Sequence, residues 1–272
     1  MKKYLSLLLA CLFLLCLTPC AFAAGFEEGE QTWPVEADLD GDGVSETLAI
    51  VDILKEDGEA RTGIEVSKGT ERCTAETEIA GFRKLFLNDL DGDGLPEILF
   101  TGSEDIDAMV HSYCWRYTGG TLVPVPFEEG EVLAGLIAAV SPYELNILRI
   151  VDALGTYTGY MDMRFEDGKI VFDSDAWRIA DDDLTYTPVL TVKQDIYVLT
   201  SVGDEGEYGE EALLEEGTVI YLLETDAKTW VSYVTETGEG GVILLEEDEN
   251  GFPTFVNGMP ETEVFEGIEY AG

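Results

Sequence analysis

The sequence predicts an all-β protein, built from a repeat domain followed by a small barrel. Short apolar runs rich in Val, Ile, Leu, Tyr and Phe alternate with Gly/Asp turns, and few segments show the 3.6-residue apolar period of a helix. A nine-residue acidic loop occurs twice, 51 residues apart. The last third of the chain places short apolar runs between Gly-rich turns. These observations together favour strands throughout.

The first 23 residues form a predicted signal peptide. Two lysines precede an apolar run over residues 5–17, and a small-x-small site ends at Ala23, where we expect cleavage. The run is shorter than the roughly 20 residues of a spanning helix. Cys20 only loosely resembles a lipidation site, because proline precedes it. We therefore expect a secreted or cell-surface protein that does not span a membrane after cleavage.

The chain is strongly acidic. It has 56 Asp and Glu against 15 Lys and Arg, a formal net charge of −41 at pH 7. Nucleic acid and anionic membranes are poor partners for such a surface. The plentiful apolar runs argue against disorder. Bound divalent cations would offset the self-repulsion of so many carboxylates.

Two cysteines remain after signal cleavage, Cys73 and Cys114. An even pair in an exported chain permits one disulfide, and two buried thiols are the alternative. Both remain open. A metal site on these cysteines is not expected, because their spacing is wrong and the only histidine is His111.

Residues 24–180 are expected to form the repeat domain. Each acidic loop is followed by a Glu, an apolar strand, a polar turn and another strand. The strands are predicted at 47–51, 84–87, 98–100, 109–117, 122–125, 147–151, 161–165 and 169–172. The hairpin turns are predicted at Asp57-Gly58, Gly119-Gly120 and Asp167-Gly168. A third unit, residues 144–178, lacks the acidic loop. Because closed propellers have about 4–8 blades, three units predict a partial or small propeller-like assembly, or a sandwich.

The C-terminal part is expected to be a small barrel over residues 184–250, after a boundary near 181–183. Its predicted strands are 190–199, 219–223, 230–234 and 242–245. Residues 251–272 are an acidic segment with scattered apolar residues. This segment is either a tail or a last strand.

The two acidic loops read DLDGDGVSE at 38–46 and DLDGDGLPE at 89–97. Calcium takes six to eight oxygen ligands, including carboxylates and backbone carbonyls. Acids at positions 1, 3 and 5 of a tight loop converge on one point, and the glycine at position 6 permits the sharp turn. The carbonyl at position 7 and the acid at position 9 complete a calcium shell.

Other readings of these loops fit less well. An EF-hand needs a Glu at position 12 and flanking helices, whereas position 12 is Ala49 or Phe100 and strands flank both loops. A dockerin-like pair of loops would also be helical and more closely spaced. A polar hairpin turn without an ion explains one copy, but two copies at matched positions weaken this explanation.

The pattern D-x-D-G-D-G-x-x-E followed by an apolar strand resembles the calcium loops of FG-GAP/VCBS-type repeats, over residues 32–125 and more weakly to 178. The resemblance implies two Ca²⁺ sites whose role is structural. Their ligands would be Asp38, Asp40, Asp42, the carbonyl of Val44 and Glu46 at the first site, and Asp89, Asp91, Asp93, the carbonyl of Leu95 and Glu97 at the second.

Residues 186–246 resemble a bacterial SH3-like (SH3b) domain. The likeness rests on three segments: Leu213-Leu214-Glu215-Glu216-Gly217-Thr218-Val219, which leads into Tyr221-Leu222-Leu223; Trp230-Val231-Ser232-Tyr233-Val234; and Gly238-Glu239-Gly240-Gly241-Val242. Gly241 stands where the family has its second tryptophan. The resemblance implies a domain that binds cell-wall peptides, and a barrel that only packs on the repeat domain is the alternative.

The sequence offers little support for an enzyme and no assignable catalytic residue. It contains no G-x-S-x-G, H-E-x-x-H or phosphate loop, and His111 lies in an aromatic strand. We expect an exported calcium-binding β protein that acts as a binding or scaffolding module at the cell surface, with cell-wall peptide, glycan or a surface protein as partner. A secreted carbohydrate-active enzyme with paired carboxylates is the alternative.

Overall fold

The computed structural model describes residues 34–54, 60–79, 83–103, 110–141, 144–179, 187–202 and 207–270. The predicted signal peptide, the turn at Asp57-Gly58 and the boundary at 181–183 lie outside these residues. The described chain is all-β, as predicted: it has one short helix, α2 (Glu261–Val264), and several antiparallel sheets, of which none closes on itself. Within the described ranges, no helix has the length and apolar character needed to cross a membrane.

Two antiparallel sheets form the N-terminal part. The first has the order β1-β2-β3-β4, and the second has β5-β6-β7-β8 with β9 also paired to β7. The strands of the first sheet are β1 (Val35–Ala37), β2 (Glu46–Leu54), β3 (Ala60–Lys68) and β4 (Glu71–Glu76). Those of the second are β5 (Arg83–Asn88), β6 (Glu97–Ser103), β7 (Val110–Thr118), β8 (Thr121–Pro124) and β9 (Leu133–Ala134). The strand predictions in this region are confirmed, and Gly119-Gly120 forms the predicted turn between β7 and β8.

The third unit is a further meander. It consists of β10 (Leu136–Ser141), β11 (Glu144–Asp152), β12 (Thr156–Glu166) and β13 (Lys169–Phe172). The turn at Asp167-Gly168 joins β12 to β13 as predicted. Only residues 142–143, outside the described chain, separate β10 from β11, so this unit has no room for an acidic loop at the equivalent position.

The sheet of the third unit continues into the C-terminal strands, because β14 pairs with both β12 and β18. The order is β10-β11-β12-β14-β18-β19-β20-β16-β17, with β15 on β18. The C-terminal strands are β14 (Trp177–Arg178), β15 (Val189–Val192), β16 (Ile196–Val202), β17 (Glu207–Leu214), β18 (Val219–Thr225), β19 (Trp230–Thr235) and β20 (Gly240–Leu244).

One predicted strand, 190–199, is wrong as a single element. The structure divides it into β15 and β16, separated by the polar residues Lys193, Gln194 and Asp195. The backbone N–H of Lys193 donates to Val264 O at 2.7 Å, and Asp195 Oδ1 accepts the N–H of Glu216 at 2.8 Å. These bonds fix a turn where the apolar alternation is interrupted.

The described part of the acidic C-terminal segment is folded. It contains β22 (Pro253–Val256), β23 (Met259–Pro260), α2 and β24 (Phe265–Glu266), and β21 (Glu246–Glu247) precedes it and pairs with β22. β24 pairs with β15, and Val256, Val264 and Phe265 are buried. Three of the scattered apolar residues of this segment therefore belong to the lower core.

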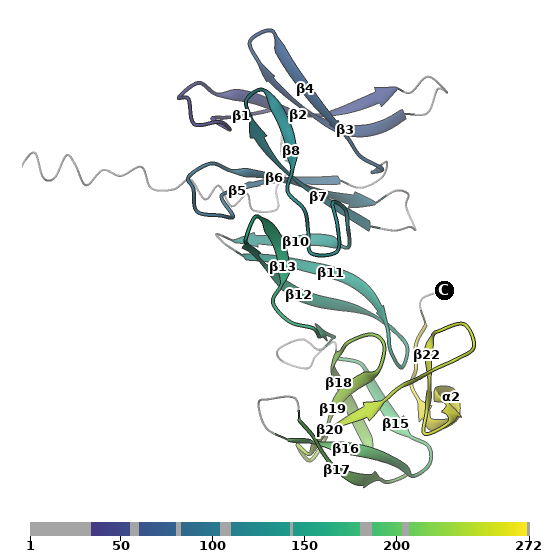
Figure 1. Ribbon diagram of the computed structural model, residues 1–272. Coiled ribbons are helices and arrows are strands. Elements are labelled where there is room, and N and C mark those ends of the chain that lie inside the picture. The colour runs from purple at the N-terminus through teal and green to yellow at the C-terminus, as the bar shows by residue number, and fades with distance from the viewer. Residues whose placement is uncertain are drawn as a thin grey trace, which may run out of the picture.

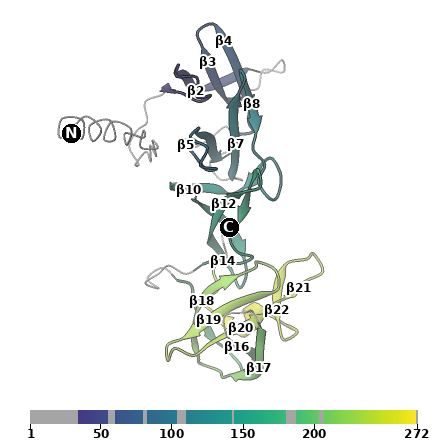
Figure 2. The same cartoon turned by 60° about the vertical axis from the view of Figure 1, so that its left-hand side comes forward.

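The sheets lie one above the other along the molecule, from the first sheet at one end to the C-terminal strands at the other (Figures 1 and 2). β6 is buried on both faces. Ile98 and Phe100 point into the core shared by the first and second sheets, which we call the upper core. Leu99 points into the core shared with the third unit and the C-terminal strands, which we call the lower core. The second sheet is thus the central layer of the stack.

The two cysteines form no disulfide. Cys114 is buried in the lower core, and Cys73 packs at the margin of the upper core. Burial raises the pKa of both thiols, most strongly that of Cys114. Of the two alternatives left open by the sequence, the structure has the free thiols.

Candidate metal centres

Each acidic loop joins the first strand of its sheet to the second. Residues 38–45 lie between β1 and β2, and residues 89–96 lie between β5 and β6. The carboxylate at position 1 organises the first loop from within: Asp38 Oδ1 accepts the N–H of Gly41 at 2.8 Å, and Asp38 Oδ2 accepts that of Gly43 at 2.9 Å. Oxygens that already accept an N–H retain a second lone pair for a cation.

The second loop repeats this geometry. Asp89 Oδ1 accepts the N–H of Gly92 at 2.8 Å, and Asp89 Oδ2 accepts that of Gly94 at 2.9 Å. The position-6 glycines, Gly43 and Gly94, have φ of +83° and +92°. A residue with a Cβ rarely adopts this conformation, so the turn needs glycine at this point.

The carboxylates at positions 3 and 5 bind the backbone in the same way in both loops. In the first loop, Asp42 N–H donates to Asp40 Oδ1 at 3.3 Å and Val44 N–H donates to Asp42 Oδ1 at 2.9 Å. The corresponding distances in the second loop are 3.0 Å from Asp93 to Asp91 and 2.8 Å from Leu95 to Asp93. Val44 and Leu95 are therefore fixed at position 7 by the acid at position 5.

The glutamates at position 9 anchor the start of each loop. Glu46 and Glu97 are fully buried, and each accepts a backbone N–H at 2.8 Å through Oε2, from Leu39 and Leu90 respectively. The side chains of these two leucines are also buried, Leu39 in the upper core and Leu90 in the lower core. Each loop is thus attached to the core below it by one leucine and one buried carboxylate.

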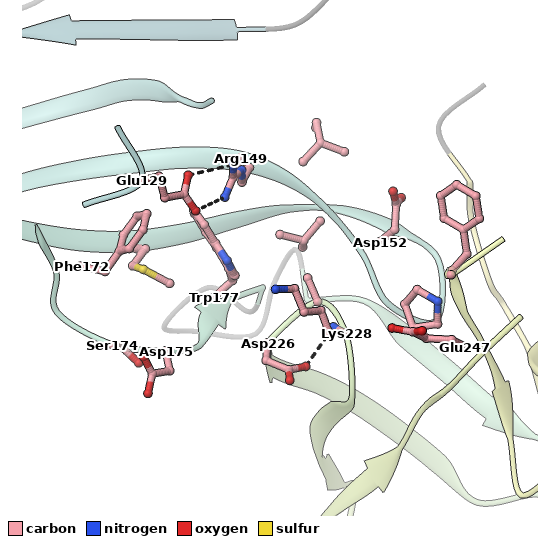
Figure 3. A pocket seen from close by; sticks show the side chains of 17 residues that line it. Glu129, Arg149, Asp152, Phe172, Ser174, Asp175, Trp177, Asp226, Lys228 and Glu247 are labelled. Atoms are coloured by element: carbon pink, nitrogen blue, oxygen red, sulfur yellow. Dashed lines mark hydrogen bonds and ion pairs between the residues drawn. The ribbon is translucent and has the colours of Figure 1, made fainter. Parts of the chain in front are cut away.

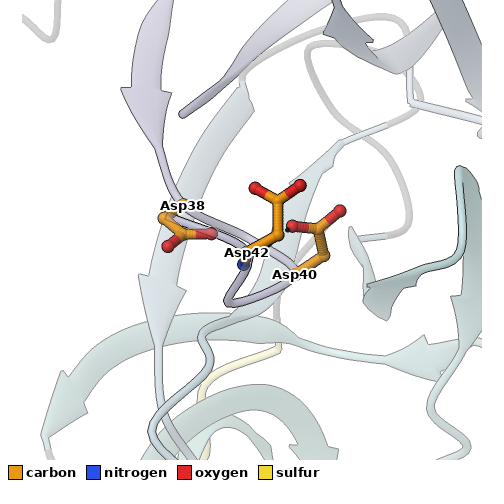
Figure 4. A group of neighbouring side chains, drawn as sticks. All are labelled: Asp38, Asp40 and Asp42. Carbon is orange, nitrogen blue, oxygen red and sulfur yellow. Dashed lines mark hydrogen bonds between the residues drawn. The ribbon is translucent and has the colours of Figure 1, made fainter. Parts of the chain in front are cut away.

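The structure brings most of the predicted ligands together. Carboxylate oxygens of Asp38, Asp40 and Asp42 lie within 4.8 Å of one another in the first loop (Figure 4). In the second loop the corresponding group is Asp89, Asp91 and Glu97. Glu46 lies outside the first group and Asp93 outside the second. Both groups have the donor chemistry and the spacing that fit a hard cation such as Ca²⁺.

Sequence reasoning missed a basic residue at the first loop. Lys68, the last residue of β3, places Nζ 2.9 Å from Asp40 Oδ2, 2.7 Å from Asp42 Oδ2 and 2.5 Å from Glu46 Oε1. Thr47 pairs with Ser67 across β2 and β3, so Glu46 and Lys68 face each other one step further along. The ammonium lies where the free carboxylate oxygens converge.

Arg116 holds the equivalent place at the second loop. Ile98 pairs with Trp115, so Glu97 and Arg116 face each other across β6 and β7. The Arg116 guanidinium bonds to Glu97 Oε1, at 3.0 Å from Nε and 2.5 Å from Nη2, and to Asp91 Oδ2. The sequence signal was a basic residue near the end of the second strand after each loop.

Two loop carboxyl groups have pKa values that are shifted in opposite directions. The hydrogen bond from Lys68 is the main cause that lowers the pKa of Asp42, and the three carboxylates raise the pKa of Lys68. Burial raises the pKa of Glu97, and this exceeds the lowering by the Leu90 N–H and by Arg116. Desolvation of Glu97 is therefore only partly compensated by its partners.

The third unit keeps the pair of residues but not the loop. Glu144 and Arg164 are register partners in β11 and β12. Glu46 and Lys68 lie one step beyond the Thr47–Ser67 pair, and Glu97 and Arg116 lie one step beyond the Ile98–Trp115 pair. Arg164 forms ion pairs with Glu166 at 2.8 Å and with Asp173. All three units therefore have a glutamate that faces a basic residue on the neighbouring strand. Only the first two units also have the acidic loop.

Comparisons with known proteins give no relative for this chain: no family model, curated protein or solved structure matches it. The acidic loops and their basic partners are therefore the observations on which an interpretation of function rests.

Proposed function

We propose that the chain is an exported calcium-binding β protein that acts as a binding or scaffolding module at the cell surface, with calcium in a structural role. One observation carries this proposal: two separate loops, one in the first sheet and one in the central sheet, have the same five carboxylate–backbone hydrogen bonds. Structural ions of this kind stabilise the folded state because their site does not exist in the unfolded chain.

The basic residues set the strength of the proposed sites. Lys68 and Arg116 already neutralise part of each carboxylate cluster, so they hold the loop in shape without an ion. Calcium at the first loop would use the lone pairs of Asp38, Asp40, Asp42 and Glu46 with the Val44 carbonyl, and would compete with the ammonium for three of these carboxylates. Such competition fits a weak site, in the range of about 10⁻⁴–10⁻³ M known for extracellular modules.

The finer architecture is also part of the proposal. The stacked meanders are consistent with FG-GAP/VCBS-like repeats, and the C-terminal strands with an SH3-like module. At the family's second tryptophan position, a Cβ on Gly241 would lie 2.6 Å from Tyr233 Oη and 2.8 Å from Leu199 O. No side chain fits there, so we expect the ligand surface of this chain to lie elsewhere than in such a groove.

Calcium is expected to raise the melting temperature of the mature protein and to bind with a Kd of about 10⁻⁴–10⁻³ M. Isothermal titration calorimetry and thermal melts in calcium and in chelator measure both effects. Replacing Asp38 and Asp89 by Asn should abolish the response, whereas Asp175→Asn, at an exposed acid outside both loops, should leave it intact. A protein that takes up no calcium at about 10 mM and melts identically in chelator would refute the proposal.

The variant Lys68→Met is expected to bind calcium at the first loop about tenfold more tightly. A unit charge about 4 Å away contributes roughly 1–4 kcal/mol at the dielectric constants of a protein surface, and 1.4 kcal/mol is a factor of ten. The matched control is Lys169→Met, which changes the net charge equally at the first residue of β13, away from both loops. Unchanged affinity in Lys68→Met would show that the ammonium and the ion do not share a site.

A further inference from the structure

Two adjoining cavities lie between the third unit and the C-terminal segment. The larger, about 590 Å³, is lined by β11, β14, the β18–β19 loop and the turn before β22 (Figure 3). The smaller, about 200 Å³, lies between the β11–β12 turn, β22, α2 and Tyr270. They share Asp152, Phe252 and Pro253 as a common wall. The two cavities therefore form one cleft with a wide and a narrow end.

The narrow end has a firmly held backbone. Leu154, in the β11–β12 turn, is a fully buried non-glycine residue with φ of +55°, and its carbonyl accepts the hydroxyl of Tyr157 at 2.6 Å. A bulky residue in this conformation is strained, and it persists only where its surroundings fix it. Such positions gather at ligand-binding sites.

Glu261 supplies a buried carboxylate to the narrow end. It is 2% exposed, and one oxygen accepts the hydroxyl of Tyr270. Its other oxygen, Oε2, is buried and has no hydrogen-bond partner among the described residues. Burial raises the pKa of Glu261, Tyr270 lowers it, and the nearby charge of Asp152 raises it. A buried polar atom without a partner is rare, and a cationic or hydrogen-bond-donating group would satisfy it.

The wide end adds negative charge. Arg149 is already paired with Glu129 at 3.1 and 3.2 Å, and its guanidinium lies 5.4 Å from the Trp177 ring. Asp226 is used by three backbone N–H groups and a threonine hydroxyl. Among the described residues, Asp175 and Glu247 make no ion pair, and Lys228 is the single basic side chain of the cleft that no carboxylate neutralises.

The exposed apolar surface of the cleft is centred on Phe252 and Pro253, which line both cavities. Trp177 is 7% exposed and covered by Arg149, so it offers no free face to a sugar ring. Phe252, on the wall common to both cavities, is 55% exposed. Together with Pro253 and Leu154, it can contact a hydrocarbon chain that leads to Glu261.

We propose that this cleft binds an aliphatic primary amine, with the ammonium held between Glu261 and Asp152 at the narrow end and the carbon chain against Phe252 and Pro253. The amine can belong to a free polyamine or to the side chain of a basic peptide. The inference rests on the proposed binding role of the protein and names the chemistry of its ligand. It does not depend on calcium, because the cleft contains no residue of either acidic loop.

The test is a calorimetric titration of the mature protein at about 0.15 M salt, where the attraction between exposed charges is screened beyond about 8 Å. The probes are 1,5-diaminopentane and the blocked tripeptide acetyl-Gly-Lys-Gly-amide. We expect saturable one-site binding of the diamine, and tighter binding of the tripeptide if the natural source is a peptide. Pentane-1,5-diol and the tripeptide with acetylated lysine, which lack the ammonium, should not bind.

Two variants locate the site. Glu261→Gln keeps the shape of the side chain and is expected to weaken amine binding at least tenfold, as is Asp152→Asn. Glu263→Gln, an exposed acid on the same helix, removes the same charge and should not change the affinity. Thermal melts confirm that each variant is folded. Equal affinity in folded Glu261→Gln and Glu263→Gln, binding of the diol, or no binding of either amine at millimolar concentration would overturn the proposal.

The same titration on Asp38→Asn/Asp89→Asn separates this inference from the proposed calcium role. Amine binding that survives in this variant, when calcium uptake is lost, shows two independent sites. If the wild-type chain takes up no calcium but binds the amine, the calcium proposal fails and the amine-binding proposal stands. If the chain takes up calcium but binds no amine, only the amine-binding proposal fails.

Discussion

Replacing Glu97 by alanine is expected to lower the free energy of unfolding by about 2–4 kcal/mol. Glu97 is fully buried, accepts the N–H of Leu90 and pairs with Arg116. Its removal leaves a buried N–H without an acceptor and deprives Arg116 of one of its two carboxylate partners. The loss stays below that of a fully buried pair, because the Arg116 side chain is 29% exposed and Asp91 still contacts it.

Denaturant unfolding in chelator measures this effect without any contribution from an ion. Asp93→Ala is the matched control in the same loop: its exposed carboxylate accepts only the N–H of Leu95, so its loss should cost less than about 1 kcal/mol. Glu97→Gln, which can still accept the Leu90 N–H, should lie between the two. Equal stability of Glu97→Ala and Asp93→Ala would mean that the buried carboxylate does not hold the loop.

The all-β class and most strands could be predicted because apolar alternation and glycine turns act locally. The strand at 84–87 has Leu85 and Leu87 inward, and the turn at Asp167-Gly168 is a hairpin signal that depends on two residues. The prediction of a single strand at 190–199 was wrong because contacts with distant parts of the chain interrupt it. Two residues distant in sequence fix the turn at 193–195: the Val264 carbonyl accepts the N–H of Lys193, and the Glu216 N–H donates to Asp195.

The loop carboxylates were predictable, but their partners were not. Positions 1, 3, 5 and 9 lie within nine residues, and the local turn brings three of the four carboxylates together in each loop. Lys68 reaches the first loop only through the register of β2 and β3, and Arg116 reaches the second through that of β6 and β7. A register is set by the packing of whole strands. A basic residue near the end of the second strand after each loop is a signal in the sequence, but it does not by itself show which loop residue it will face.

The cleft was not predictable at all. Glu261 was one of 56 acidic residues in the sequence, and its segment read as an acidic tail or a last strand. Its burial depends on β24 pairing with β15 and on Tyr270 lying over α2. Both contacts join segments that no local pattern connects.

Replacing Phe100 by alanine is expected to cost about 3–5 kcal/mol in the free energy of unfolding. Phe100 is fully buried in the upper core, on the strand that forms the centre of the stack. The lost ring leaves a cavity between two sheets, and neither sheet can close it without moving its neighbours. The neighbouring Trp115 and Tyr113, whose rings are stacked at 5.4 Å, would lose packing on the same face.

The decisive comparison is with a residue of the same sheet that lies outside both cores. Val123 on the edge strand β8 is 47% exposed, so Val123→Ala should change stability by less than about 1 kcal/mol.

The Phe100→Ala variant also tests whether the sheets unfold together. Because β6 belongs to the upper core through Phe100 and to the lower core through Leu99, we expect the first three sheets to unfold in one transition at a lower denaturant midpoint. If the first sheet instead unfolds separately while the rest keeps the wild-type midpoint, the central sheet does not couple the two cores.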